Sequence, residues 1–146
     1  MEYRKYGDTL LVRIDRGEEI VAAVRTVAEA EQISLASVTA IGATDDFTVG
    51  VYDVEKQSYT PNTFHGAYEI VSLTGTIDRM EGAVYTHLHM SAGGARGEVF
   101  GGHLNRATVS ATCEMVIRRM DGAVDRRRDP ETGLNLFRFP EDSTRS

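Results

Sequence analysis

The chain opens with a short apolar run and then changes to a helical pattern. Residues 9–14 are rich in apolar and β-branched side chains, as expected of a strand with a buried face. Asp15 and Glu18 stand three residues apart, the spacing of a capping box at the start of a helix. Apolar residues then recur at helical spacing, at Ile20, Val21, Val24, Val27 and Ala28. The pattern predicts one amphipathic helix over residues 18–32.

The remainder of the chain has the residue pattern of β-strands. Alternating or continuous apolar runs predict strands at residues 37–41, 46–52, 67–77, 83–90 and 107–118. Gly75 interrupts the third run and predicts a bulge there. The turn signal Asp121-Gly122 predicts a hairpin that begins at the end of the last run. Residues 62–66 and the glycine-rich residues 91–102 are interpreted as loops.

One helix among many strands predicts an α+β fold in which the helix covers one face of a sheet. Length favours a single domain, which we expect over residues 1–128. The C-terminal tail, residues 129–146, is expected to lie on the surface through its apolar side chains, with its last six residues disordered.

Composition bears on whether this domain binds DNA or a membrane. Its 16 basic and 22 acidic residues give a net charge of -6, which disfavours DNA binding by the isolated chain, although a local basic patch is compatible with it. Arg118, Arg119, Arg126, Arg127 and Arg128 would form such a patch on the expected hairpin, or a salt-bridged solvated face. No stretch approaches the roughly 20 apolar residues of a membrane helix, and no signal-like segment is found, which predicts a cytoplasmic protein.

Three of the four histidines form the main candidate site. His87 and His89 fall in a predicted strand, where alternation places both on one face. His103 follows a glycine-rich segment that can return the chain to the same place. Three neutral imidazoles suit zinc or another divalent metal, and three protein ligands leave a coordination position open for a substrate or water. The competing interpretation is two histidines that simply alternate on an exposed strand face.

The motifs around these histidines resemble those of the PPC domain, the plants and prokaryotes conserved domain. The similar segments are His87-Leu88-His89, then Gly101-Gly102-His103-Leu104, then Thr112-Cys113-Glu114, together with Gly66-Ala67-Tyr68-Glu69-Ile70. The resemblance covers nearly the whole domain, residues 3–128. Two features depart from the plant pattern: the chain has no AT-hook, and Ala67 replaces an arginine.

The resemblance implies a curved, mostly antiparallel sheet and assembly as a homotrimer. It implies a metal on His87, His89 and His103, in a fold similar to that of acetolactate decarboxylase. It also implies that Glu69, which matches a family glutamate, acts as a general base or orients a histidine; the alternative is an exposed strand carboxylate. Glu114 could reach the metal or an adjacent subunit, or form a structural salt bridge. His65 is either a surface histidine or a fourth ligand.

Three functions remain open at this point. The first is a trimeric PPC-type domain with a three-histidine metal site that acts as a DNA-binding or regulatory protein. The second is a metal-dependent hydrolase or lyase acting on a small carbonyl or ester substrate, with Glu69 or Glu114 moving a proton. The third is an oligomeric module that binds a small-molecule ligand.

Overall fold

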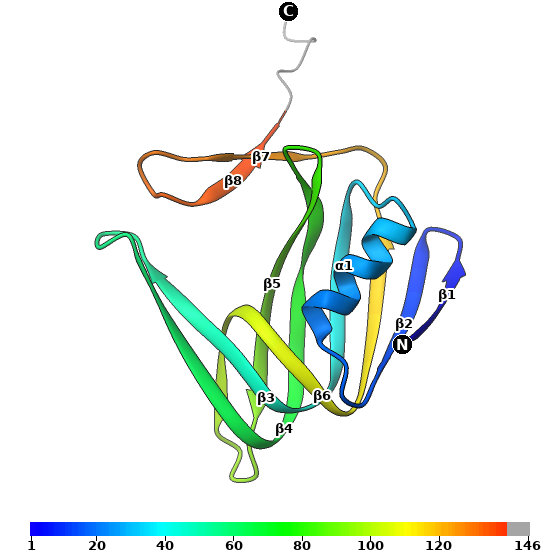
Figure 1. Cartoon of the computed structure of the whole chain (residues 1–146), viewed down its shortest axis with the longest axis vertical. Helices are drawn as coiled ribbons and strands as arrows, with labels where there is room; N and C mark the ends of the chain where they lie inside the picture. Colours follow the sequence, from blue (N-terminus) through cyan, green and yellow to red (C-terminus); the bar gives the residue numbers. More distant parts are fainter. Residues whose placement is uncertain (140–146) are drawn as a thin grey trace, which may run out of the picture.

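The structure, a computed structural model, describes residues 1–139 as one helix and eight strands (Figure 1). The six residues expected to be disordered lie outside this described part. The elements are β1 (Glu2–Tyr6), β2 (Thr9–Asp15), α1 (Ile20–Ala30), β3 (Ala36–Asp53), β4 (Ser58–Met80), β5 (Ala83–Gly93), β6 (Val99–Arg119), β7 (Asp125–Arg128) and β8 (Asn135–Arg138).

Six of these strands form one antiparallel sheet in the order β1-β2-β6-β3-β4-β5. The start of β6 also pairs with the end of β5, so β3, β4, β5 and β6 close on one another. Helix α1 packs against one side of this curved sheet (Figure 1). The expected α+β architecture, a mostly antiparallel sheet covered by one helix, is confirmed.

The strands are longer than their hydrophobic pattern indicates. β3 joins the two runs predicted at 37–41 and 46–52, and β4 contains residues 62–66, so the prediction of a loop there was wrong. Register shifts between Ala40 and Gly42 and between Thr44 and Asp46 explain why the pattern of β3 indicated two separate strands. A bulge bends a strand without ending its pairing, and it also breaks the alternation from which strands are read.

Gly75 does not mark a bulge, contrary to expectation. It pairs in regular register with Val38 and Leu88, and the irregularity in β4 lies between Ile70 and Ser72. A Cβ atom at position 75 would overlap the backbone carbonyl of His87. The glycine therefore lets β4 lie very close to the strand that carries two of the candidate ligands.

The helix is shorter than residues 18–32 because its cap is Glu19. The Glu19 carboxylate accepts hydrogen bonds from two N–H groups of the first turn, at 2.9 and 2.7 Å. Glu18 instead accepts from the Asp15 backbone N–H at 2.7 Å, which is one half of the expected capping box, formed just before the helix. The buried residues of α1 are Ile20, Ala23, Val24, Val27 and Ala28. No helix in the described part is long and apolar enough to cross a membrane.

The segment after β6 does not fold back on β6, so the hairpin predicted at Asp121-Gly122 was wrong. β7 pairs only with β8 and lies at the end of β4 (Figure 1). The physical reason is Arg126, whose side chain is buried against Asp78 of β4. The arginines expected to share one hairpin are therefore divided between the end of β6 and β7.

Candidate metal centre

Strand β5 presents its histidines away from the core. Leu88 and Met90 are buried, whereas His87 and His89 lie on the opposite, outer face. This is the expected period-2 alternation of a strand with one buried face. On β4, Thr76 and Thr74 lie directly opposite the two histidines.

The third histidine arrives through the hairpin between β5 and β6. The expected loop over residues 91–102 is mostly strand, because β5 extends to Gly93 and β6 begins at Val99. Gly97 donates to the carbonyl of Gly94 at 3.0 Å and adopts φ +83°, a conformation that favours glycine. This tight turn sets the register that places His103 directly opposite His89.

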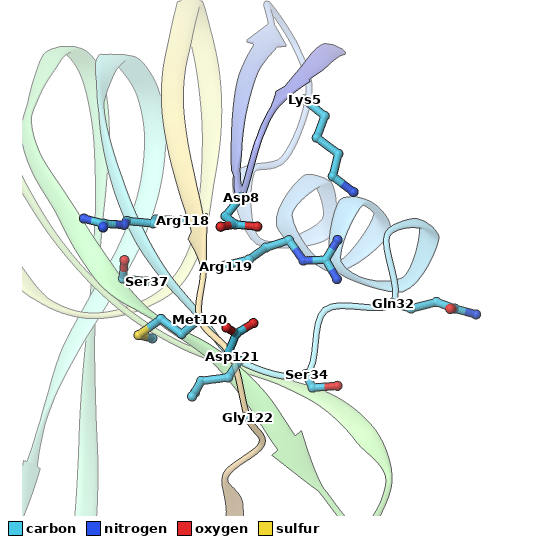
Figure 2. A pocket seen from close by; sticks show the side chains of 11 residues that line it. Lys5, Asp8, Gln32, Ser34, Ser37, Arg118, Arg119, Met120, Asp121 and Gly122 are labelled. Atoms are coloured by element: carbon cyan, nitrogen blue, oxygen red, sulfur yellow. The ribbon is translucent and has the colours of Figure 1, made fainter.

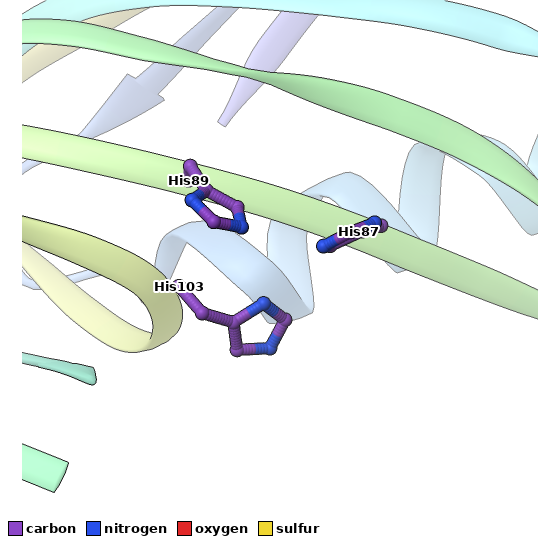
Figure 3. Close-up of side chains that lie close together, drawn as sticks. All are labelled: His87, His89 and His103. Atoms are coloured by element: carbon purple, nitrogen blue, oxygen red, sulfur yellow. The ribbon is translucent and has the colours of Figure 1, made fainter. Parts of the chain in front are cut away.

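The three imidazoles converge on one point outside the sheet (Figure 3). Their ring centroids form a nearly equilateral triangle with sides of 5.2, 5.3 and 5.4 Å. One ligand nitrogen from each ring lies within 4.8 Å of the others. These residues form the only possible metal-ligating group of three or more among residues 1–139.

The electrostatic environment favours neutral imidazoles. Burial lowers the pKa of His87 below its ordinary value, and the charge of Arg126 lowers it further. Burial and the neighbouring His89 also lower the pKa of His103. Because only a neutral imidazole has a lone pair for a metal, both shifts favour metal binding near neutral pH.

A buried ion pair stands next to His87. The Arg126 guanidinium donates to both carboxylate oxygens of Asp78, from Nε at 2.6 Å and from Nη2 at 2.8 Å. It also lies 4.5 Å from the ring centroid of Tyr85 and 4.3 Å from that of Phe137. Sequence reasoning missed this pair because the two residues are 48 positions apart and neither lies in a motif.

The β7–β8 ribbon and the β3–β4 arm (residues 50–61) flank the outer face near the site. Gln57, at the tip of the arm, donates from Nε2 to the carbonyl of Glu131 in the ribbon at 3.2 Å. Arg126 donates from Nη1 to the carbonyl of Asn135 at 2.8 Å, and Asn135 contacts the Tyr85 hydroxyl at 3.4 Å. The tail is thus attached to both the sheet and the arm.

Sequence reasoning missed two further polar residues near His103, Tyr59 and Asn105. The Tyr59 hydroxyl donates to Asn105 Oδ1 at 2.5 Å and lies 3.3 Å from the carbonyl oxygen of His103. Its ring meets the His103 ring edge-on, with centroids 6.1 Å apart. Burial raises the pKa of Tyr59, so the phenol remains a hydrogen-bond donor at neutral pH.

The structure does not bring the two candidate acids into the histidine cluster. Glu69 is exposed and pairs with Gly93, four residues beyond His89, or about 13 Å along the strand. Glu114 lies on the outer face between Arg13 and Ile41, and no ion pair is found for it in the described part of the chain.

Cys113 and His65 both lie outside the histidine cluster. Cys113 is fully buried, and burial raises its thiol pKa to about 12, which fits a core residue rather than a nucleophile. His65 is 72% exposed and lies 3.2 Å from Asp46, outside the histidine cluster.

A polar groove of about 740 Å³ lies elsewhere, near the β1–β2 turn and the end of β6 (Figure 2). Lys5, Arg118 and Arg119 line it together with Asp8 and Asp121. Because both signs of charge are present, the groove has no strong preference for a polyanion such as DNA.

The fold and the outward-facing histidines define a small α+β domain with a surface site, and comparison identifies its family. The sequence profile of the Plants and Prokaryotes Conserved (PCC) domain matches residues 1–121. The chain belongs to this family, the one indicated above as PPC. A comparison with proteins of curated function found no match.

The chain is also similar to several proteins of solved structure. A candidate DNA-binding protein from Bacteroides thetaiotaomicron is 31% identical, with a TM-score of 0.92 over 94% of this chain and 96% of that one. A metal-containing protein from Archaeoglobus fulgidus is 33% identical, with a TM-score of 0.84 over 94% and 97%. A plant- and prokaryote-conserved protein from Pyrococcus horikoshii is 28% identical, with a TM-score of 0.83 over 96% of each chain.

Replacing Arg126 by methionine should destabilise the domain, because the Asp78 carboxylate would remain fully buried without its counter-charge. We expect the free energy of unfolding, measured with urea, to fall by about 3 kcal/mol. The exposed neighbour provides a matched control: Arg127→Met should change stability by less than about 0.5 kcal/mol.

The double variant Asp78→Leu/Arg126→Met tests the cause of this loss. It removes both charges, so it should be more stable than Arg126→Met alone. A double variant that is equally or less stable would contradict an uncompensated buried charge as the source.

Proposed function

We propose that the chain is a metal-binding regulatory domain that holds zinc or another divalent cation on His87, His89 and His103. The observation that carries the proposal is the triangle of imidazoles, two from β5 and one from β6. The metal-containing relative from Archaeoglobus supports it.

The donor set fits such an ion. Nitrogen ligands at 2.0–2.1 Å in a tetrahedron lie about 3.3 Å apart. Ligand atoms within 4.8 Å of one another need only small side-chain rotations to reach that spacing. Three histidines leave a fourth position open, where a small-molecule ligand would bind. A cytoplasmic location stays a prediction from the sequence.

Elemental analysis of the purified protein at neutral pH tests the site. We expect one divalent ion per chain in the parent and none in His89→Ala, because two imidazoles hold such an ion too weakly. His65→Ala is the matched control and should retain the ion, since His65 lies outside the cluster. Equal metal in the parent and in His89→Ala, or none in either, would refute the site.

We also propose that the domain assembles as a homotrimer through its outer sheet face. Four large apolar residues from four strands are exposed there: Leu11 (47%), Ile41 (61%), Val71 (55%) and Val116 (40%). Two adjoining hollows of this face share Ile41, Glu114 and Val116, so the apolar surface is continuous. Contiguous exposed apolar surface of this kind is typical of a subunit interface.

Light scattering after gel filtration tests the assembly. We expect the parent to have three times the mass of one chain and Val116→Lys to shift toward the monomer, because a charged side chain would replace apolar surface at the interface. Val51→Lys is the control: Val51 is 62% exposed but lies on the β3–β4 arm. A monomeric parent, or a trimeric Val116→Lys, would refute this interface.

We expect duplex DNA to bind this chain only weakly. One relative, from Bacteroides thetaiotaomicron, is a candidate DNA-binding protein. The charge of -6 and the mixed groove work against tight binding by this chain. We expect any affinity for duplex DNA, measured by fluorescence anisotropy, to fall about tenfold between roughly 50 and 200 mM salt. Tight binding that persists at the higher salt would contradict this expectation.

The second candidate is a metal-dependent hydrolase or lyase with an acetolactate-decarboxylase-like fold. The open coordination position favours it, because a bound cation can polarise a carbonyl or lower the pKa of water. Glu69 is its predicted base, although the strand register places that residue away from the histidines. Turnover of an ester or keto acid that disappears on chelation would favour the enzyme over the regulatory domain.

A further inference from the structure

Asn105 lies two residues beyond His103 on β6 and has an unusual backbone position. Thr48 of β3 pairs with Arg106, and Val49 pairs with Leu104, so Asn105 has no partner on β3. This is a β-bulge, a feature that is frequent beside functional sites because it re-aims side chains.

The bulge places two consecutive residues on the outer face. Leu104 and Ala107 are buried, whereas Asn105 and Arg106 between them are not. Arg106 forms a bidentate ion pair with Asp46, with both distances 2.7 Å. Asn105 is left on the same face as His103, two residues away.

Tyr59 fixes the orientation of the Asn105 amide. Its hydroxyl has one proton, which it donates to Asn105 Oδ1 at 2.5 Å. The ring reaches this position by lying directly over Gly50, where any Cβ atom would overlap it. The amide oxygen of Asn105 therefore accepts the Tyr59 hydrogen bond, and the Nδ2 group on the other side of the amide points away from Tyr59.

Asn105 is exposed, and its Nδ2 group donates to no acceptor within residues 1–139. An oriented amide N–H donor without a protein acceptor, beside a site with an open coordination position, is suited to a ligand oxygen. Tyr59 also contacts the His103 carbonyl. This contact fixes the position of Tyr59, and through it that of the Asn105 amide, relative to the strand that carries His103.

We infer that Asn105 donates a hydrogen bond from Nδ2 to an oxygen atom of the ligand that binds at the three-histidine site. Asn105 thereby selects small carboxylates and carbonyl compounds, whose second oxygen or carbonyl oxygen can accept it. Tyr59 is a positioning residue that acts through Asn105. The inference rests on the metal site proposed above and adds the class of its ligand.

Cobalt(II)-loaded protein provides the test, because the visible absorption of the ion reports which anion binds to it. Acetate carries a second oxygen that can accept from Asn105, whereas thiocyanate is a poor acceptor. We expect Asn105→Ala to weaken acetate binding about tenfold, the effect of one hydrogen bond to a charged group, and to change thiocyanate binding less than about twofold.

Two further variants distinguish loss of the Asn105 amide orientation from a nonspecific effect of substitution. Tyr59→Phe keeps Asn105 but releases its amide, so it should weaken acetate binding about threefold and leave thiocyanate unchanged. Asn62→Ala removes an exposed asparagine of β4 and should change neither.

The outcomes distinguish this inference from the metal site itself. Unchanged acetate binding in Asn105→Ala, or equal weakening of both anions, would overturn the role of Asn105 and leave the metal site standing. Loss of cobalt from Asn105→Ala would also overturn it, because the side chain would then support the ion and not its ligand. A parent that takes up no cobalt would overturn both.

Discussion

The antiparallel pairing of β5 with β6 is the constraint on which the site depends. It opposes His89 to His103, while the alternation of β5 adds His87 to the same face. A shift of one residue would turn His103 toward the core and leave two histidines without the third. Glycines protect this arrangement at two close backbone approaches: Gly75 beside the carbonyl of His87, and Gly102 beside the carbonyl of Gly50.

The site also depends on a segment outside the matched family profile, which ends at residue 121. Arg126 brings β7 to the outer end of β4 and holds it there through Asp78. The same guanidinium lies close enough to lower the pKa of His87. One buried ion pair thus fixes a flank of the site and adjusts the charge state of a candidate ligand.

Local patterns predicted the features that depend on neighbours in sequence. Strand alternation placed His87 and His89 on one face, and the glycines predicted the return of His103. The bulges of β3 and β4 were missed because they break the alternation that identifies a strand. Asp78 and Arg126 were missed for a different reason: only the full strand register shows that residues 48 positions apart meet. Tyr59 and Asn105, 46 positions apart, share this limit.

The hairpin that carries the histidines has a consequence for the order of folding. His87 and His103 belong to two strands joined by one tight turn, so their meeting requires closure of a short loop only. The contact between Asp78 and Arg126 must close a loop about three times longer. Hairpins form within microseconds, and longer closures cost more entropy. Loop length therefore favours assembly of the three imidazoles first, followed by the flank beside them.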